Sequence, residues 1–406
     1  MTEHSAGVAA IDAEVAVAGG GLVGAALALG LARGGRRVAL IDRAVPAYNP
    51  GELGFDIRTV ALNEKSAGLL GELGVWHDLA RCPFERMKVW ESRGTRSIEF
   101  AAAEAGATQL GWIVEVGQLT RDLWALIGDE PNVQTVTGGS IVDVHPAPHS
   151  VAVVTEEHRV EAGLLVAADG GQSAVRALLG IGAAALETGH CALATVVETQ
   201  RPHNGKAMQV FLPEGPLAFL PLPDRDGRHF SAIVWSQPAE LAEARVAMDS
   251  DTFAAELERA GEGCLGRILA VDRRVAFGLT QRVAERFSPC PRVLLAGDAA
   301  RVLHPLAGQG VNLGFEDVAE LLDVARAVAG DALAEPDLWQ GYARRRRLRA
   351  EILVRAMDAF RMVYGNNNPW FSWLRNVGVD LVNAAPGVKA QLIKEAMGVG
   401  PLARTL

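Results

Sequence analysis

The sequence predicts an α/β protein in which a mostly parallel βαβ sheet is combined with a mixed or antiparallel second sheet and C-terminal helices. Three observations predict this fold. Short apolar runs followed directly by glycine occur at Glu14–Ala18, Leu164–Asp169 and Arg292–Ala296, as is typical of buried parallel strands. Alternating segments separated by proline and glycine turns fill the middle of the chain. Beyond about Gly330 the pattern is helical.

The composition indicates a globular protein with more than one structural unit. The 406 residues exceed one ordinary core, and 49% of them are apolar while 21% are charged. A net charge of −9 argues against nucleic acid as a partner, because nucleic-acid binding needs a basic footprint. The four scattered cysteines and the absence of a basic leader predict a cytoplasmic protein. The uncharged stretch Val15–Ala32 is expected to be a buried strand and helix, because glycines interrupt it.

The first apolar strand runs into a glycine-rich loop, Gly19–Gly24, which matches G-x-G-x-x-G. Gly19 permits a tight turn, Gly21 lets the backbone approach a pyrophosphate, and Gly24 lets the next helix lie close to the strand. The helix offers free N–H groups to phosphates, and Asp42 ends the following strand, where an acidic side chain binds a ribose. The residues expected to contact the dinucleotide here are Gly19, Gly21, Leu22, Val23, Gly24, Asp42 and Arg43.

A second match to the same pattern, Gly261–Gly266, follows the helix-like segment Asp251–Ala260 instead of a strand. No strand with an acidic end follows at the required distance. We therefore interpret Gly261–Gly266 as a turn that ends a helix, and assign nucleotide binding to Gly19–Gly24. The loop alone does not distinguish FAD from a nicotinamide cofactor.

Two later motifs make that distinction. Asp169-Gly170 and Gly297-Asp298 each follow a buried strand. Together with Gly19–Gly24, their order and spacing over nearly the whole chain resemble the group A flavoprotein monooxygenases, the p-hydroxybenzoate hydroxylase-like superfamily. The resemblance implies FAD as cofactor and NADH or NADPH as electron donor. It also implies that oxygen adds to C4a of the reduced flavin, and that the hydroperoxide hydroxylates an aromatic ring.

The same resemblance assigns further roles. Asp298 is expected to bind the ribityl chain of FAD, and Asp169, with Arg176 as a second candidate, to serve FAD and NAD(P)H. Arg58 is expected on the flavin side, and Gln118 and Arg121 on a helix that contacts FAD. The residues assigned to FAD in this way are Arg58, Gln118, Arg121, Asp169, Gly297 and Asp298.

The segment after Gly297-Asp298 opens a long helix near Gly310. Its N-terminus would point at the pyrimidine ring, where a helix dipole stabilises the negative charge of reduced flavin. Gly308 and Gly310 allow close backbone approach. The cofactor contacts expected in this segment are Gly308, Gly310, Val311 and Asn312. His304, next to Pro305, is the catalytic candidate as a proton relay, with a purely structural role as the alternative.

Within the superfamily, the string HPLAGQGVNLG resembles the ubiquinone-biosynthesis hydroxylases. Leu70–Trp76, Gly111–Glu115 and Phe360–Leu374 resemble the branch that acts on 2-polyprenyl-3-methyl-6-methoxy-1,4-benzoquinol. The implied substrate is a polyprenyl phenol or quinol lipid. Another phenolic substrate, or a non-catalytic flavin-binding subunit of a biosynthetic complex, remains as an alternative. Arg301 departs from the His or Gln usual in the family, and predicts a permanent charge near the flavin entrance.

These motifs predict a division of the chain into four segments. Residues 1–181 form the first part of the FAD-binding domain, with strands near 85–115 that join the substrate sheet. Residues 182–276 form the substrate-binding sheet, 277–330 the second part of the FAD-binding domain, and 331–406 a helical region. The side chains expected to line an aromatic and prenyl pocket are Phe211, Phe219, Leu220, Pro221, Leu222 and Trp235.

The strongest basic run in the helical tail is Arg344–Arg347. It is expected to be a solvated helix face; the alternative is an electrostatic contact for anionic lipid or an acidic partner. That alternative corresponds to a cytoplasmic protein associated peripherally with the inner membrane or with a biosynthetic complex.

Overall fold

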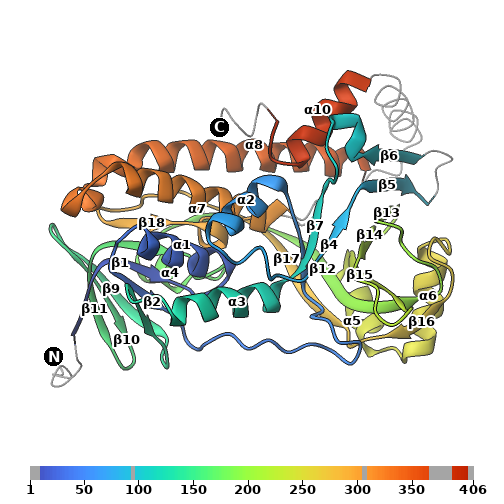
Figure 1. Cartoon of the computed structure of the whole chain (residues 1–406), viewed down its shortest axis with the longest axis horizontal. Helices are drawn as coiled ribbons and strands as arrows, with labels where there is room; N and C mark the ends of the chain where they lie inside the picture. Colours follow the sequence, from blue (N-terminus) through green and yellow to red (C-terminus); the bar gives the residue numbers. More distant parts are fainter. Residues whose placement is uncertain (1–9, 93–96, 304–308, 365–385, 401–406) are drawn as a thin grey trace.

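The computed structural model describes residues 10–92, 97–303, 309–364 and 386–400. The chain forms a mostly parallel sheet at one end of the molecule and a larger mixed sheet at the other, and two long helices run along one side of the molecule (Figure 1). These are α7 (Gln309–Ala327) and α8 (Gln340–Tyr364). The predicted α/β fold with a second sheet and C-terminal helices is confirmed.

The parallel sheet has seven strands in the order β8-β2-β1-β11-β10-β9, with β18 also paired to β11. β1, β2, β8, β11 and β18 are parallel, whereas β9 and β10 add an antiparallel hairpin. The strands are β1 (Ala10–Ala18), β2 (Val38–Ile41), β8 (Val133–Val136), β9 (Ile141–Pro146), β10 (Val151–Thr155), β11 (Arg159–Ala167) and β18 (Val293–Leu295).

The central strand β11 explains how motifs far apart in the sequence come together. Its first half pairs with β10 and its second half with β18, while β1 follows its other edge. Ala167 at its end is in register with both Ala18 and Leu295. The loops after these three strands, which begin at Gly19, Ala168 and Ala296, therefore start at one edge of the sheet. The carboxyl edge of a parallel sheet is where such folds bind nucleotides.

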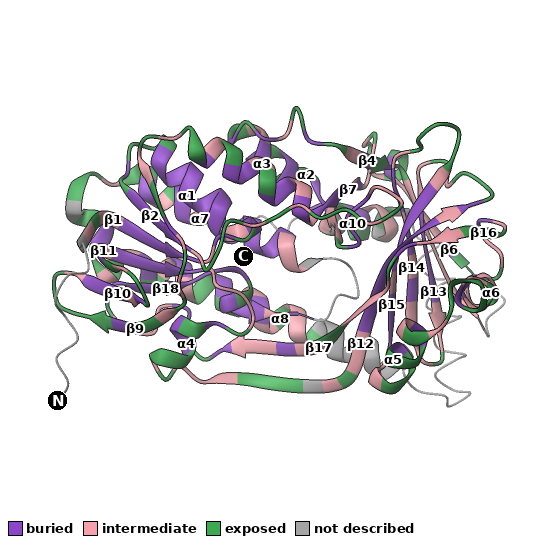
Figure 2. Ribbon diagram, turned by 90° about the horizontal axis from the view of Figure 1, so that it is seen from below, coloured by how far each residue is buried: buried purple, intermediate pink, exposed green. Residues whose placement is uncertain are grey.

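Helices α1 (Leu22–Arg33), α3 (Val116–Gly128) and α7 pack with this sheet around the largest apolar core. A Cβ on Gly30 would lie 2.5 Å from the side chain of Leu322, so α1 and α7 approach each other closely at this glycine. Figure 2 shows α1 and much of α7, β1 and β11 as buried, whereas α3 also carries exposed residues. The uncharged stretch Val15–Ala32 is divided between β1 and α1, as predicted. No helix in the described ranges is long and apolar enough to cross a membrane.

The second sheet has nine strands in the order β19-β17-β12-β15-β14-β13-β5-β6, with β16 beside β12. The 17-residue strand β12 reaches from the parallel-sheet end into the centre of this sheet (Figure 2). The strands are β5 (Arg86–Glu91), β6 (Ser97–Ala101), β12 (Ala183–Thr199), β13 (Lys206–Leu212), β14 (Gly215–Pro221), β15 (His229–Pro238), β16 (Ile268–Val271), β17 (Val275–Ala284) and β19 (Arg301–Val302).

One face of the nine-stranded sheet packs against α6 (Ser250–Ala260). Gly261 caps the end of α6, which confirms that Gly261–Gly266 begins as a helix-terminating turn. α5 (Ala239–Ala247) lies beside β12 and β17. A third, small sheet joins the two ends of the molecule. Its strands, in the order β3-β7-β4, are β3 (Thr59–Leu62), β7 (Gly111–Glu115) and β4 (Arg81–Phe84).

The helices not yet placed are α2 (Glu64–Glu72), α4 (Ala174–Leu178) and α10 (Pro386–Ala396). α10 lies next to β6 (Figure 1). The strands that start within residues 85–115 are divided: β5 and β6 belong to the nine-stranded sheet, and β7 to the small one.

Candidate FAD site and substrate cavity

In the Gly19–Gly24 loop, close backbone contacts leave no room for a side chain at Gly19 or Gly24. Gly19 has a φ of +99°, and a Cβ there would lie 2.5 Å from the carbonyl oxygen of Ala168. A Cβ on Gly24 would lie 1.8 Å from the carbonyl oxygen of Gly19. The Gly20 N–H donates to Asp42 Oδ2 at 2.5 Å. Asp42 thus holds the loop itself, in addition to the ribose role expected of it.

Gly21 differs from its neighbours, because a Cβ there would meet nothing within 4 Å. The space beside it is open, and no side chain caps α1, so the N–H groups of the first helical turn are available to a ligand. An anionic pyrophosphate fits this set of donors. Leu22 is buried in the core behind the loop, and Arg43 is exposed.

Val23 is the point at which the two glycine-rich segments meet. Cβ atoms on Gly297 and Gly314 would lie 3.1 Å and 2.5 Å from its side chain. Val23 therefore packs between the Gly297-Asp298 turn and α7. The predicted first and second cofactor segments are therefore in direct contact.

Asp298 lies in the interior of the molecule. Its side chain is nevertheless accessible, because it borders an internal cavity. The low polarity of these surroundings raises the pKa of Asp298; Arg301 opposes this shift and Asp317 adds to it. A carboxylate that points into a cavity at this depth fits a hydrogen-bonding partner for the hydroxyl groups of a ribityl chain.

Beneath the Gly297-Asp298 turn lies a buried ion network. Asp317 accepts hydrogen bonds from Arg301 Nη1 at 2.5 Å, from Arg346 Nε at 2.5 Å and from the Gly297 N–H at 2.9 Å. Asp317 is 0% exposed and Arg301 3%. Burial alone would raise the pKa of Asp317, but the two arginines hold it below its usual value. The expectation that Arg301 places a charge at the flavin entrance is wrong, since its guanidinium faces into this network.

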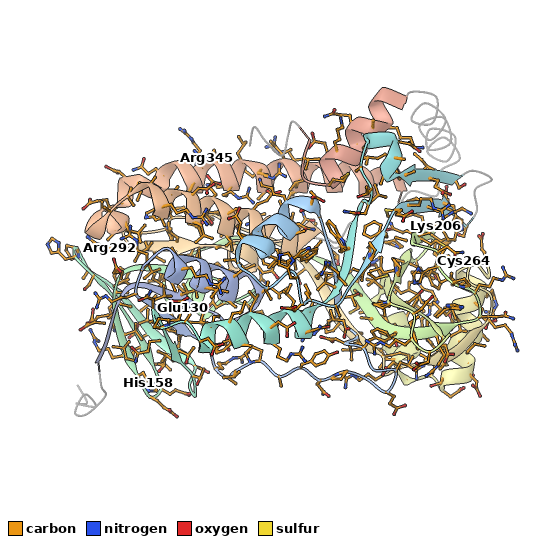
Figure 3. The ribbon with its side chains drawn as sticks, in the orientation of Figure 1. Glu130, His158, Lys206, Cys264, Arg292 and Arg345 are labelled. Atoms are coloured by element: carbon orange, nitrogen blue, oxygen red, sulfur yellow. The ribbon has the colours of Figure 1, made fainter. Side chains whose placement is uncertain are left out.

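The four arginines Arg344–Arg347 do not form one surface. Arg346 is buried in the network, whereas Arg345 and Arg347 pair with glutamates of α7 and α8. Figure 3 shows Arg345 on the outer side of α8. Arg344 is the only one of the four without an ion pair to a described residue. The expectation of a solvated helix face is therefore wrong for Arg346, because a 3.6-residue period turns successive side chains in different directions.

Asn312, in the first turn of α7, joins the helix to the small sheet. Its Oδ1 accepts from the Asn63 N–H at 3.0 Å and from the Ser66 hydroxyl at 2.7 Å, and its Nδ2 donates to the Ala61 carbonyl at 2.8 Å. The side chain was predicted as a cofactor contact, and the structure shows it engaged with protein groups. It fixes the backbone at the edge where Gly310 and Val311 line the cavity.

The D-G motif is tied to the G-D motif by Arg176. Its guanidinium donates to the carbonyls of Ala299 and Gly171, each at 2.7 Å. Arg176 is buried, and burial lowers its pKa. Asp169 Oδ2 accepts from the Val175 N–H at 3.1 Å, while its Oδ1 is buried without a partner among the described residues. That oxygen remains available to a cofactor.

The other residues expected at FAD lie along β3 and α3. Arg58 and Arg121 are exposed, and Gln118 is half-buried. The Arg121 guanidinium lies 4.9 Å from the centre of the Tyr48 ring. The Tyr48 hydroxyl donates to Glu115 at 2.9 Å; burial and this carboxylate raise the pKa of Tyr48 to about 12. His304, Pro305 and Gly308 lie outside the described residues.

A cavity of about 450 Å³ extends from this edge to the nine-stranded sheet. At one side it is bordered by Asp298, Gly310 and Val311, and at another by Leu392 of α10, whose side chain is 47% exposed. Its remaining walls are mostly apolar. They include Phe84, Met87, Phe100, Leu110, Ile113, Ala207, Ala218, Leu220, Val234, Leu303, Ile393 and Met397.

The alternation of the strands decides which side chains reach this cavity. On β14, Pro216, Ala218 and Leu220 line it, whereas Phe219 points to the opposite core. Trp235 of β15 points to that core as well. Of the six side chains predicted to line the pocket, only Leu220 does so. The period of two along a strand places Phe219 and Trp235 behind the sheet.

Sequence reasoning missed the acid that organises the site. Asp317 lies on the buried side of α7, four residues after Leu313 and four before Leu321, both of which are buried. A carboxylate within an apolar stripe of this spacing is the signal that indicates a buried ion pair. Nothing in the sequence identified Arg301 and Arg346 as its partners.

Comparison with known proteins agrees with this geometry. A family model described as "FAD binding domain" matches residues 12–357. The chain is also 35% identical to the 3-demethoxyubiquinol 3-hydroxylase of Escherichia coli (strain K12), over 95% of this chain and 98% of that protein. The chain belongs to the FAD-dependent hydroxylases. Its cofactor is therefore FAD, and its family is that of the ubiquinone hydroxylases that the sequence resembles.

Other members of the hydroxylase family extend the likeness. Ubiquinone hydroxylase UbiL of Rhodospirillum rubrum is 32% identical over 95% of this chain and 90% of its own length. Among solved structures, p-nitrophenol 4-monooxygenase PnpA of Pseudomonas putida DLL-E4 superposes with a TM-score of 0.80. That pair covers 97% of this chain and 99% of the other at 21% identity, so it shows the shared fold.

Proposed function

We propose that this hydroxylase uses NADH or NADPH and O2 to hydroxylate the ring of a polyprenylated phenol or quinol in ubiquinone biosynthesis. FAD supplies the redox and oxygen-activating chemistry when it is bound. The observation that carries the proposal is the apolar cavity that begins at Asp298 and reaches α10. It offers a position for the ring beside the cofactor segments and an apolar channel for the polyprenyl chain.

The charges of the cavity favour a neutral ring. Its lining among the described residues contains no lysine, arginine or histidine, and Asp298 is its only ionisable group. A carboxylated ring would have no counter-ion there and would lose its hydration. A phenol or quinol with an apolar chain loses little on entering. The names of the relatives, 3-demethoxyubiquinol 3-hydroxylase and ubiquinone hydroxylase, support the same substrate class.

The residues of the chain bind FAD, orient the substrate ring and shield it from water. The first turn of α1 binds the pyrophosphate at Gly21, and Asp298 binds the ribityl hydroxyls. The backbone of Gly310 and Val311 forms the edge at the N-terminus of α7, where N–H groups favour negative charge. The apolar cavity walls exclude water from the reacting ring. His304 remains the proposed proton relay.

The test is NAD(P)H oxidation by the FAD-loaded protein, with and without a short-chain prenylphenol. We expect oxidation to be stimulated by the phenol and the hydroxylated ring to accumulate in step with it. Unstimulated oxidation with no product would contradict the proposal and favour a flavin-binding subunit. Stimulation by small phenols alone, with no gain from a prenyl chain, would leave the mechanism but overturn the substrate class.

A prenyl lipid lies in a bilayer, so this substrate requires at least transient peripheral contact with the inner membrane or a carrier complex. Flotation with anionic vesicles that contain a prenylquinol tests the contact. We expect co-flotation that Arg344→Glu weakens, because Arg344 is the one member of its run without an ion pair to a described residue. Equal flotation of the variant would exclude Arg344 from the contact.

A further inference from the structure

Two polar side chains interrupt the apolar cavity wall that β13, β14 and β15 form. Gln209 of β13 and Ser236 of β15 both line the cavity, and they are 8% and 3% exposed. Their immediate neighbours, Met208 and Trp235, point to the core on the other side of the sheet. Gln209 and Ser236 therefore belong to the same face, which is the face toward the cavity.

Both side chains have unused hydrogen-bonding capacity. Among the described residues, neither the Gln209 amide nor the Ser236 hydroxyl meets a hydrogen-bond partner. The cavity asparagines differ, since Asn63 caps α2 and Asn312 is clamped to the small sheet. Because both side chains border the cavity, their polar groups are placed to pair with a molecule bound inside it.

The surroundings of Gln209 leave room for a flat ligand. Its partner across the β13–β14 pair is Ala218, and the partner of Ala218 on β15 is Val234. These three residues form one row across the cavity floor, in which the amide is next to a methyl group. A ring can lie on Ala218 and Val234 with an oxygen substituent directed at Gln209. Thr59 also has an unpartnered hydroxyl, but it lies on β3, away from this floor.

We propose that Gln209 and Ser236 hydrogen-bond the oxygen substituents of the substrate ring and so determine which ring carbon faces the cofactor. The amide NH2 donates to a methoxy or carbonyl oxygen, its Oε1 accepts from a phenolic hydroxyl, and the serine hydroxyl does either. Both groups are neutral, in keeping with a ring that carries no charge. This assignment rests on the proposed function, since it names the residues that orient that substrate.

The experiment compares Gln209→Leu and Ser236→Ala with the wild-type holoenzyme. Two probes are used, a short-chain prenylphenol and the same molecule with hydrogen in place of its hydroxyl. Binding is followed by the change in flavin absorbance, and turnover by NAD(P)H consumed, ring product and hydrogen peroxide formed. The matched control is Met208→Leu, which alters the same strand on the face away from the cavity.

We expect wild type to bind the phenol more tightly than the hydroxyl-free probe. In Gln209→Leu, the ratio of the two affinities should fall about tenfold. Affinity for the hydroxyl-free probe should stay the same or rise. A ring held less firmly should also send more of the consumed NAD(P)H to hydrogen peroxide, or yield a second ring product. Ser236→Ala should change the probe preference, the hydrogen peroxide yield and the product position by a smaller factor. Met208→Leu should leave all three unchanged.

Two results separate the possible failures. If wild type shows no phenol-stimulated oxidation, the proposed function fails. If wild type turns over normally while both variants keep its preference, coupling and product position, the function stands and the assignment of Gln209 and Ser236 is wrong. Equal flavin content and thermal unfolding of the variants establish that any loss comes from the cavity and not from misfolding.

Discussion

The two segments that border the FAD site are stabilised in different ways. The Gly19–Gly24 loop rests on close backbone contact, since Cβ atoms on Gly19 and Gly24 would collide with carbonyl oxygens. The turn at Gly297 is stabilised by electrostatic interactions, because its N–H and two arginines all contact the buried Asp317. The first segment is therefore vulnerable to added volume and the second to removed charge.

This difference also determines how far a change spreads. A clash in the loop acts locally, where α1 leaves β1. The network under Gly297 joins β19, α7 and α8 through Arg301, Asp317 and Arg346, so a change there reaches three elements. A buried charge without its partner is among the most destabilising changes a core can suffer.

The largest effect is expected from Asp317→Ala. It leaves Arg301 and Arg346 buried without their shared carboxylate, which should lower the free energy of unfolding by about 3–5 kcal/mol. Urea or thermal unfolding of the apoprotein measures this loss. Asp323→Ala is the control on the same helix, because the Asp323 side chain is 75% exposed and its removal should cost less than about 0.5 kcal/mol. Similar losses in the two variants would contradict the proposed role of the network.

Asp317 also gives the comparison a pH dependence. Because its pKa is lowered in the folded protein, its stabilisation is complete above the unfolded value of about 3.9 and is lost as the pH falls further. Wild type should therefore lose stability more steeply than Asp317→Ala as the pH falls below about 4. Parallel acid-unfolding curves would show that the carboxylate is not held in its charged form.

The next effect in size is expected from Gly24→Ala. The added Cβ would lie 1.8 Å from the Gly19 carbonyl oxygen, so α1 must shift, at a cost of about 1–3 kcal/mol and with loss of FAD. Unfolding curves and flavin content after purification measure both. Gly68→Ala in α2 is the control, since its Cβ meets nothing within 4 Å and should stabilise the helix by about 0.5–1 kcal/mol.

The contrast explains what the sequence predicted and what it did not. The first loop is local: strand, turn, helix and acid lie within residues 14–42, and each has a composition signal. The second match to the glycine pattern, Gly261–Gly266, lacks this local context and was interpreted as a turn that ends a helix. Gly261 at the end of α6 confirms this interpretation. The network needs side chains from three elements. Arg301 was therefore placed at the flavin entrance, because nothing near it in sequence indicates Asp317 as its partner.

The cavity shows the same limit. The alternating segments predicted a sheet in the middle of the chain, but the side of the sheet that faces the cofactor depends on how the sheets pack. Phe219 and Trp235 were predicted to line the pocket, and they fill the core against α6 instead. Gln209 was overlooked because an isolated glutamine in a strand is ordinarily a surface residue.

A smaller change in stability is expected from Gly21→Ala, and it separates folding from cofactor binding. Its Cβ would enter open space, and Gly21 adopts φ −69° and ψ −173°, which alanine accepts. The apoprotein should keep its stability within about 0.5 kcal/mol, whereas FAD affinity should fall at least about tenfold, measured by fluorescence titration. Unchanged affinity would show that the pyrophosphate does not bind at Gly21.

The smallest effect is expected from Arg345→Ala, compared with Arg346→Ala at the adjacent position. The Arg345 side chain is 48% exposed and pairs with Glu320, and an exposed pair of this kind contributes about 0–1 kcal/mol. The Arg346 side chain is 4% exposed and pairs with Asp317 and Glu316, so its removal should cost about 3–5 kcal/mol. The loss in Arg345→Ala should disappear in 1 M salt, where the Debye length falls to about 3 Å, while that in Arg346→Ala should persist. Thermal unfolding at low and high salt measures both differences. Equal losses at the two positions would mean that this helix responds to total charge and not to burial, and the distinction between the volume-sensitive loop and the charge-sensitive turn would lose its basis.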